Sequence, residues 1–527
     1  MSTKAKKSTT RSTHAKTIAA IKRNRTRRLA SLITRSYYLH KKKQDEQLYG
    51  LICEEFMSLG GVYVKFLQGV LLRSQIMRKW HNPEKLNIFE NLDSEPIDIM
   101  KFLQNELPKD KLSQIAMIQP MPFAAGSFGQ VYYGQLRTGE PIIVKVLRPM
   151  VRELLKYDLK LLTTFSKTFM VKLNKNMNMQ IGDALKDFSA ATLRETDYKH
   201  EAEFANELHE AYKGHNTIVI PKTYLDLCTN NIIVQDYVDG ISVAQIIRMH
   251  EQGVDPAVYV KEQLGSDLIT QLQNLGYESV MSVFRLRRIQ GDPHPGNIRL
   301  MRNNKVGMID FGISAQAPED KSGLFGLFES YDKVFKGSQT AIGLFEHSMR
   351  FFVSDLYRSL KRLGDYIGKN DDRDYVKDVS KIAGDVFQQA TGSDIINADF
   401  KNDSSVLVII NKMVNKGNRF GLVMKLEATE ILRATQTFTS MLGSLGLYAK
   451  VMPSVIDHSV KDIRRLYPEV IQDSKETVSI GDAIETVANW LERVAARDPM
   501  LFRQLSDKIR FNKVVPAVEP EEEVQTS

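Results

Sequence analysis

Short runs of apolar, mostly β-branched residues predict strands in the middle of the chain. Ile142 to Val144 form one such run, after a Thr138-Gly139 pair that suits a hairpin turn. Ile232 to Val234 form another, and Val306 to Ile309 form a third. Runs of this length, bounded by turn residues, are typical of buried strands. We therefore expect a small sheet of five strands within residues 119–240.

Apolar residues recur with helical spacing in other parts of the chain. The segment from Ile181 to Tyr212 is rich in charge, contains no proline and repeats apolar residues at helical intervals, which predicts one continuous helix. After Asp310 the pattern is almost entirely helical, and its last clear helix covers Ile480 to Val494. This mixture of strands and helices predicts an α+β fold.

Composition is consistent with an enzyme of some size. The chain has 527 residues, of which 43% are hydrophobic and 26% charged, enough for a two-lobed core with helical additions. Cys53 and Cys228 are isolated, which argues against a disulfide scaffold and for a reducing compartment. No apolar run reaches the roughly 18 residues of a membrane span. We expect the best candidate, residues 434–449, to form a buried helix and turn.

Positive charge is concentrated at the N-terminus. Residues 1–44 contain 14 Lys or Arg and no Asp or Glu, so the remaining chain carries −5 of a total of +9. This basic segment could form an amphipathic helix, and three functions would suit such a helix. They are attachment to anionic lipid, a mitochondrial-type presequence and nucleic-acid binding. Nothing elsewhere resembles a nucleic-acid module, so a nucleic-acid partner is not expected. The alternative, which we adopt for residues 1–44, is a solvated disordered arm.

One group of motifs is typical of phosphoryl-transfer enzymes. The sequence Gln-Gly-Asp-Pro-His-Pro-Gly-Asn over residues 290–297 is followed by Asp-Phe-Gly over residues 310–312. In protein kinases an Asp of the catalytic loop orients the nucleophile, while an Asn five residues later and the Asp of Asp-Phe-Gly hold two magnesium ions. By the same order and spacing, we expect Asp292 to be catalytic and Asn297 and Asp310 to bind metal. His294 is expected to fix the loop.

A candidate nucleotide-binding loop lies upstream. Residues 124–131 read Ala-Ala-Gly-Ser-Phe-Gly-Gln-Val, similar to the kinase phosphate loop with its first Gly replaced by Ala. Lys145, at the end of the predicted strand that follows, is expected to pair with the α- and β-phosphates. Asp236 and Val238 belong to a predicted hinge whose backbone would contact adenine. The loop residues expected to bind nucleotide are Ala124, Ala125, Gly126, Ser127, Phe128, Gly129 and Val131.

Two of these motifs, together with a third over residues 195–202, resemble the UbiB/AarF family of atypical kinases. They are Asp-Pro-His-Pro-Gly-Asn, the alanine-containing loop, and Glu-Thr-Asp-Tyr-Lys-His-Glu-Ala over residues 195–202, and the resemblance extends over roughly residues 50–460. It implies a two-lobed, protein-kinase-like fold that binds ATP with Mg²⁺. It also implies a link to the biosynthesis of the lipid quinone coenzyme Q. Gly126 stands where the family usually has another Ala, which makes the loop closer to that of an ordinary kinase.

The resemblance implies roles for four further positions and one ion pair. Family members carry a Lys-x-Gly-Gln motif on an N-terminal helical extension, and the nearest match here is Lys-Phe-Leu-Gln over residues 65–68. Glu201 is implied to pair with Lys145 and to share in catalysis. A family Glu-x-Asp motif is implied to lie near the lysine of the extension. The regulatory residues implied in this way are Lys65, Gln68, Glu195 and Asp197.

The predicted organisation places these motifs in a kinase-like order. It comprises a basic arm (1–44), a helical extension (45–118), an N-terminal lobe (119–240), a mostly helical C-terminal lobe (241–465), and C-terminal helices with an acidic tail (466–527). Ala-Pro-Glu at residues 317–319 is predicted to begin a helix soon after Gly312, which leaves almost no activation segment to dock a peptide. We therefore expect a small or lipid-derived acceptor.

The function expected from the sequence is an ATP-binding, Mg²⁺-dependent atypical kinase or ATPase in lipid or quinone metabolism. An ordinary protein kinase and a nucleotide-binding scaffold without turnover are the alternatives. The expected location is the cytoplasm, at the inner face of a membrane when the basic arm binds lipid, with the mitochondrial matrix as the alternative.

Overall fold

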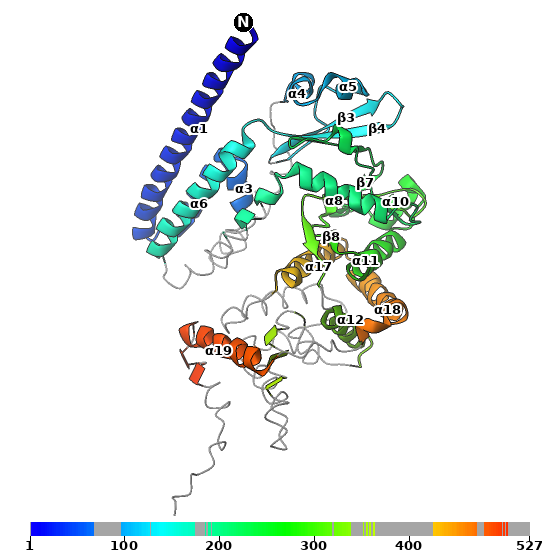
Figure 1. The fold of residues 1–527 in the computed structure, drawn as a ribbon. Coiled ribbons are helices and arrows are strands. Elements are labelled where there is room, and N and C mark those ends of the chain that lie inside the picture. Colours follow the sequence, from blue (N-terminus) through cyan, green and yellow to red (C-terminus); the bar gives the residue numbers. More distant parts are fainter. Residues whose placement is uncertain are drawn as a thin grey trace, which may run out of the picture. The chain divides into compact units, whose positions relative to one another are not determined.

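A computed structural model of the chain shows two compact units. Unit 1 comprises residues 1–215, 219–239 and 307–313, and unit 2 comprises residues 216–218, 240–306 and 314–527. Figure 1 shows the helices and strands of both. The residues that the structure describes are 2–67, 96–126, 128–173, 192–318, 321–338, 425–471 and 479–497, with a few single residues and short pieces in the intervals.

Unit 1 contains an antiparallel five-stranded sheet. Its strand order is β1-β3-β4-β6, with β2 paired to β3. The strands are β1 (Ile115–Ile118), β2 (Ala124–Ala125), β3 (Gly129–Leu136), β4 (Pro141–Leu147) and β6 (Ile232–Asp236). The hairpin predicted between β3 and β4 is confirmed, with Gly139 at φ 102° in the turn. The first strand of the sheet thus precedes residue 119, where the sequence placed the beginning of the lobe.

The alternation along β4 determines which side chains face the core. Ile142, Val144 and Val146 are fully buried in a cluster with helix α4 (Ile99–Glu106), which α5 (Lys109–Leu112) follows (Figure 1). Because neighbouring side chains of a strand point to opposite faces, Lys145 lies on the other face of the sheet. The register places it opposite Val131 of β3 and Ile233 of β6.

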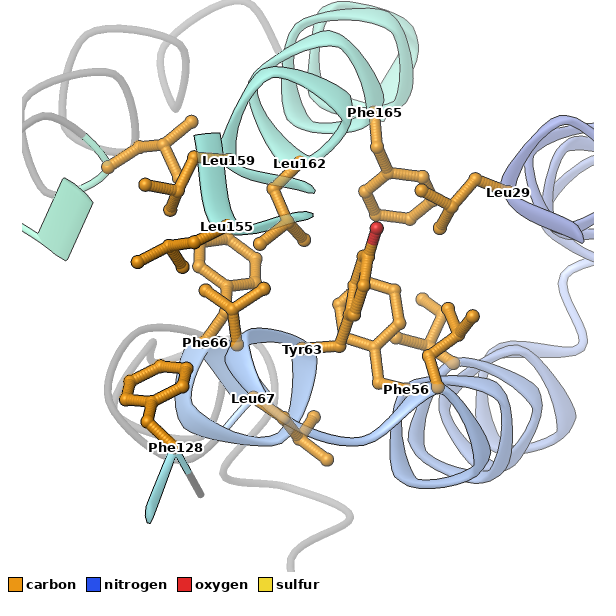
Figure 2. Packing of buried hydrophobic residues seen from close by; sticks show 14 of the residues in the cluster. Leu29, Phe56, Tyr63, Phe66, Leu67, Phe128, Leu155, Leu159, Leu162 and Phe165 are labelled. Atoms are coloured by element: carbon orange, nitrogen blue, oxygen red, sulfur yellow. The ribbon is translucent and has the colours of Figure 1, made fainter. Parts of the chain in front are cut away.

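Five further α-helices lie in the described residues of unit 1. They are α1 (Ser2–Lys41), α2 (Asp45–Leu59), α3 (Val62–Phe66), α6 (Val151–Leu173) and α8 (Tyr198–Ala211). Leu29 of α1, Phe56 of α2, Tyr63 of α3 and Phe165 of α6 share one hydrophobic cluster, which Figure 2 shows from close by. Between α2 and α3, Gly60 and Gly61 both have positive φ, at 69° and 53°, a backbone conformation that suits glycine.

The expectation of a disordered N-terminal arm is wrong. Residues 2–41 form helix α1, which lies along α6 (Figure 1). Leu29 and Leu32 are buried in the cluster, and Arg25 and Arg28 form ion pairs with Asp158 of α6 and Glu55 of α2. Burial of one apolar face, with charge pairing beside it, stabilises a helix whose sequence is otherwise strongly basic. The amphipathic helix that the sequence allowed is the structure found.

The expectation of one continuous helix from Ile181 to Tyr212 is also wrong. A turn at Glu195 and Thr196 interrupts it, and α8 begins at Tyr198. The side chain of Asp197 accepts a hydrogen bond from the His200 amide at 3.2 Å and so caps the new helix. The Thr196 hydroxyl bonds back to the Leu193 carbonyl at 2.9 Å, which closes the preceding turn.

Unit 2 is mainly helical, as the pattern after Asp310 predicts. A glycine on α11, Gly276, lets that helix approach α17 and α18 closely, because an added Cβ would meet side-chain atoms of Phe438 and Val455 at 2.9 Å. The helices that the structure describes in unit 2 are α9 (Val243–Glu251), α10 (Pro256–Leu264), α11 (Leu268–Arg285), α12 (Lys321–Phe335), α17 (Leu426–Ser444), α18 (Tyr448–Leu466) and α19 (Ile480–Arg497).

Short strands and turns complete unit 2. Strands β7 (Ile241–Ser242) and β9 (Ile298–Leu300) pair with each other, as do β8 (Arg288–Gln290) and β11 (Ser314–Gln316). The chain passes between the units within β5 (Ile218–Val219) and β10 (Val306–Met308). The described residues also include the 3-10 turns η7 (Pro295–Asn297) and η10 (Pro468–Ile471) in unit 2 and η6 (Leu225–Leu227) in unit 1.

Three expectations for the C-terminal half have separate outcomes. The helix and turn expected over residues 434–449 are confirmed by α17, the turn at Gly446 and the start of α18. The helix expected after Ala317 begins at Lys321, while Glu319 and the acidic tail lie outside the described residues. No helix in the described part of the chain combines the length and hydropathy that crossing a bilayer requires.

Candidate functional site

The centre of the candidate site is a buried ion pair between a strand and a helix. Lys145 Nζ of β4 donates to both carboxylate oxygens of Glu201, at 2.8 and 3.1 Å. Glu201 lies in the first turn of α8 and is only 3% exposed. The pairing that the resemblance implied for these two residues is therefore present. A buried carboxylate bonded through both oxygens holds the ammonium in one place.

Asp310 completes this group of charges within unit 1. Its Oδ1 lies 3.4 Å from Lys145 Nζ and accepts a hydrogen bond from the Gly312 amide at 3.2 Å. The backbone of Asp310 has φ 67°, a conformation that is uncommon outside glycine and costs of order 1 kcal/mol or more. The adjacent Phe311 packs edge-on against Phe204 of α8, with ring centroids 6.3 Å apart. This packing holds Asp310 beside the lysine against the strain of its backbone.

The three charges shift one another's pKa values. Burial disfavours the charge on Lys145, but the carboxylates of Asp310 and Glu201 outweigh it and hold the pKa of Lys145 well above its usual value. Burial opposes ionisation of Asp310 as well, yet the charge of Lys145 and the Gly312 amide keep its pKa below the ordinary range. Burial raises the pKa of Glu201 to about 7, so the ion pair weakens as the pH falls below neutrality.

The candidate phosphate loop is a tight turn between β2 and β3. Ala124 and Ala125 form β2, and the Gly126 amide donates to the Gly129 carbonyl at 2.9 Å. A Cβ on Gly129 would lie 2.4 Å from the Tyr198 hydroxyl and 2.8 Å from the Val146 carbonyl, so this position requires glycine. At Gly126, no atom of the described residues beyond its chain neighbours lies within 4 Å of the corresponding point. Ser127 lies outside the described residues.

The predicted hinge follows β6 directly. Asp236, its last residue, accepts a hydrogen bond from the Tyr224 hydroxyl at 2.7 Å, and its amide donates to the Lys222 carbonyl at 2.9 Å. Tyr237 donates its amide to the Pro141 carbonyl of β4 at 2.9 Å, and Val238 is 9% exposed. The segment is therefore fixed to the sheet along its first two residues.

The extension reaches the same region through Lys65 of α3. Its ammonium forms an ion pair with Glu195 and lies over the ring of Phe128, 4.8 Å from the centroid. Its positive charge also lowers the pKa of Asp310, as the weakest of several causes. Asp197, by contrast, caps α8, so of the two acidic residues implied near Lys65, Glu195 is the one paired with it. Gln68 lies outside the described residues.

The catalytic-loop motif lies in unit 2 and holds its own shape. The Asn297 amide nitrogen Nδ2 donates to the Asp292 carbonyl at 3.4 Å, and the backbone amide of Asn297 donates to the His294 carbonyl at 2.8 Å. His294 Nδ1 accepts from the Gly296 amide at 3.2 Å, as expected for a residue that fixes the loop. With Nδ2 so engaged, Oδ1 is the Asn297 atom suited to a cation. The convergence of this loop with Asp310 stays a prediction.

Two residues near the ion pair were not singled out from the sequence. Tyr198 is buried, with its ring 5.2 Å from Lys145 Nζ and its hydroxyl against Gly129, and burial raises its pKa. Arg148, just after β4, donates from Nη2 to the Gly126 carbonyl at 2.9 Å. Tyr198 lies inside the motif over residues 195–202, so its position there was the available signal. Nothing in the sequence distinguishes Arg148 from other arginines.

These groups suit a magnesium–nucleotide complex. The part of the chain that the structure describes has no group of three or more His, Cys, Asp or Glu side chains arranged to hold a metal ion. Mg²⁺ needs no such cage, because it binds one or two carboxylates together with substrate phosphates. Within unit 1, Asp310 supplies an oxygen ligand of that kind, and Lys145 with the loop amides supplies the groups that phosphates require. Asn297, in unit 2, offers a second oxygen of that kind.

A buried lysine–glutamate pair, an Asp-Phe-Gly aspartate beside it and a glycine-containing loop define a kinase-like domain. Residues 90–333 match the family model of the ABC1 atypical kinase-like domain. This domain, slightly less than half of the chain, thus matches the UbiB/ABC1 family, and the resemblance to UbiB/AarF proteins is confirmed. What the family model and the structure establish of the fold is a kinase-like domain with both helices and small sheets.

Several relatives carry kinase names. The Arabidopsis thaliana chloroplastic protein named Activity of BC1 Complex Kinase 1 is 25% identical over 390 residues, which cover 72% of this chain and 51% of the relative. An uncharacterized chloroplastic aarF domain-containing protein kinase from the same plant is 26% identical over 313 residues, 56% of this chain and 42% of the relative. The chain spans about half the length of these relatives.

A solved structure is also similar. It is the Mycobacterium tuberculosis protein Rv3197 in complex with erythromycin, which has 17% sequence identity and a TM-score of 0.45. The match covers 84% of this chain and 99% of that one.

Proposed function

We propose that this protein binds ATP with Mg²⁺ and acts as an atypical kinase or ATPase. Lys145 would hold the α- and β-phosphates, and the amides of residues 124–131 would cover them. Asp310 and Asn297 would bind magnesium, which neutralises the phosphate charge, and Asp292 would orient the attacking hydroxyl group or water. Asp236 and Val238 would contact adenine through their backbone.

One observation carries this proposal, namely the Lys145–Glu201 pair at 2.8 and 3.1 Å with Asp310 3.4 Å from the same ammonium. The lysine–glutamate pair and the Asp-Phe-Gly aspartate must both be in place for a protein kinase to transfer phosphate. A nucleotide-binding scaffold without turnover, the first alternative, would have no need for the lysine–glutamate pair, the Asp-Phe-Gly aspartate and a catalytic-loop Asp in the same sequence. We therefore favour turnover over simple binding.

The acceptor we propose is small or lipid-derived, as in lipid or quinone metabolism. Strand β11 begins two positions after Gly312, and α12 begins at Lys321. Almost no activation segment therefore lies between the Asp-Phe-Gly motif and α12. An ordinary protein kinase, the second alternative, uses that segment to dock its peptide. Gly126 in the loop favours a protein kinase, and the missing segment favours a small acceptor.

Turnover measurements separate these possibilities. We expect purified protein to release or transfer phosphate from Mg-ATP, with stimulation by quinone-like phenols or anionic vesicles and none by peptides. Lys145→Met is the control for contaminating ATPases. Binding of Mg-ATP with turnover no greater than that of Lys145→Met would favour the scaffold, and strong stimulation by peptides would favour a protein kinase.

We propose that the outer face of α1 contacts anionic lipid at a membrane surface. The membrane would be reached from the cytoplasm, at its inner face, or from the mitochondrial matrix. Lys16, Arg23, Arg27 and Lys41 are exposed and recur at intervals that return to one side of a helix. A shallow surface hollow includes Lys22, Arg23, Arg27 and Tyr157. Each basic residue near an anionic bilayer contributes about 1 kcal/mol to binding.

The lipid proposal calls for charge substitutions, because deleting α1 would also expose the cluster around Leu29. Arg23→Gln with Arg27→Gln should release the protein from anionic vesicles at low salt, and raised salt should do the same to the parent. Exposed Thr34→Gln, on the same face, is the matched control. Sedimentation of the double variant with vesicles as complete as that of the parent would refute this contact.

A further inference from the structure

The aromatic residue of the candidate phosphate loop is buried away from the loop. Phe128 is 8% exposed and belongs to the hydrophobic cluster formed by α1, α2, α3 and α6. Glycine-rich loops of kinases move to cover their nucleotide, so residues near their tips are usually free to shift. Here the loop side chain is part of the core of the extension.

Phe128 shares its hydrophobic cluster with residues of α3 and its end. Figure 2 shows its ring beside the α3 ribbon. Phe66 and Leu67 are both fully buried in the same cluster. The ammonium of Lys65 lies 4.8 Å from the centre of the ring, a cation–π geometry that adds directional attraction to the apolar contact. We call Phe128 and these three residues of α3 and its end the loop anchor.

The backbone on both sides of Phe128 transmits this position to the loop. The Gly126 amide donates to the Gly129 carbonyl at 2.9 Å. The Arg148 side chain donates from Nη2 to the Gly126 carbonyl, also at 2.9 Å, and so holds the turn. The amide of Arg148 bonds to the Phe128 carbonyl at 2.8 Å. A shift of α3 that drew Phe128 with it would therefore move the turn that faces the phosphates.

We propose that Phe128 is a positioning residue that links the phosphate loop to α3, so that nucleotide binding and the docking of α3 influence each other. The inference rests on the proposed nucleotide chemistry. Linkage between two binding equilibria is reciprocal, so a docked α3 that favours nucleotide requires that nucleotide stabilise α3. The extension then senses the occupancy of the site through an apolar contact, in addition to the charge of Lys65.

Hydrogen exchange of the α3 amides, residues 62–66, tests this linkage. In the parent, saturating Mg-ATP should slow their exchange several-fold. Phe128→Ala should bind Mg-ATP about tenfold more weakly, and at saturation should show no slowing in α3. Phe128→Leu keeps an apolar side chain in the cluster and should retain most of the response. Should Phe128→Ala fail to fold, Phe128→Val should lose at least half of the response.

An aromatic residue on the other side of β2 provides the control. Phe123 packs edge-on against Tyr237, with centroids 6.1 Å apart, and is 49% exposed. Phe123→Ala should leave the α3 response to nucleotide intact. A response of α3 that persists in nucleotide-saturated Phe128→Ala, or a parent that binds nucleotide without any change in α3, would overturn the proposal.

Failure of the proposed function gives a different result. If the parent binds no nucleotide, that function is wrong. The loop anchor is then tested by hydrogen exchange of the α3 amides without any ligand. Faster exchange of residues 62–66 in Phe128→Ala than in Phe123→Ala would then support the anchor, and equal exchange in the two variants would overturn it.

Discussion

The two lysine–glutamate pairs of the candidate site in unit 1, Lys145–Glu201 and Lys65–Glu195, differ in how firmly they are held. Lys145 and Glu201 lie on a seven-residue strand and a 14-residue helix, and the glutamate side chain is 4% exposed. Lys65 and Glu195 lie on a five-residue helix and in a turn, and both side chains are about a quarter exposed (26% and 25%). The first pair has the rigid support that a catalytic centre needs. The second has little support of its own, which suits a contact that forms and breaks.

Removal of the first pair should have the largest effect. Lys145→Met leaves Glu201 buried without its cation and removes the charge expected on the phosphates. We expect turnover of ATP to fall by about a thousandfold, comparable to the loss of one strong transition-state contact. Steady-state phosphate release measures this effect, and Lys156→Met, on the outer side of α6, is the control. A decrease of less than tenfold would mean that Lys145 has no part in the chemistry.

The docking of α1 can be examined through the pH dependence of stability. Burial raises the pKa of Asp158, which bonds to Tyr63 and Arg25, to about 6 from 3.8. The folded protein then keeps a proton that the unfolded chain loses above pH 4, so this carboxyl lowers stability progressively as the pH rises from about 4 to 6. Asp158→Asn has no carboxyl to titrate, so it does not lose stability in this way.

The free energy of unfolding of Asp158→Asn relative to the parent should therefore rise by up to about 3 kcal/mol across this window and level off above it. Chemical denaturation of both proteins at several pH values measures the difference. The comparison cancels the titration of all other groups. A difference that stays constant with pH would show that Asp158 is not desolvated by α1, α3 and α6.

The second lysine pair should give smaller effects. Lys65→Ala is expected to change ATP turnover or to permit self-phosphorylation while nucleotide still binds. In a double-mutant cycle for stability, Lys65→Ala and Glu195→Ala should show coupling of about 0.5 kcal/mol or more, because the two side chains are in contact.

Asp197 provides a control for the Lys65–Glu195 pair, because it lies nearby but caps α8. Asp197→Ala should cost about 1 kcal/mol through loss of the α8 cap and should be additive with Lys65→Ala. Coupling of Lys65 to Asp197 in place of Glu195, or Lys65→Ala with the parent's turnover and phosphorylation, would refute a gating role for the pair.

Local patterns were sufficient to predict the strands β4, β6 and β10 and the position of Lys145 on β4. The run Ile142 to Val144 and the turn before it identify β4, and the strand's alternation then places Lys145 away from the core. The break before α8 was missed, because the charged pattern runs on through Glu195 and Thr196 and only a cap at Asp197 reveals it.

Contacts between distant segments account for what was missed elsewhere. Helix α1 forms ion pairs with Asp158 and Glu55, which nothing in the sequence of the arm itself indicates. The burial of Phe128 against α3 is of the same kind, since the loop motif alone favours an exposed tip. Pairing partners far apart in sequence are visible only once the chain is folded.

The central claim is that Lys145, Glu201 and Asp310 form the magnesium-dependent part of a nucleotide site. The most direct measurement is the affinity for ATP by titration calorimetry, in excess Mg²⁺ and in excess chelator, for the parent and Asp310→Asn. We predict that the parent binds at least tenfold more tightly with Mg²⁺ and that Asp310→Asn loses most of this difference. Equal affinity of the parent with Mg²⁺ and with chelator would contradict the account.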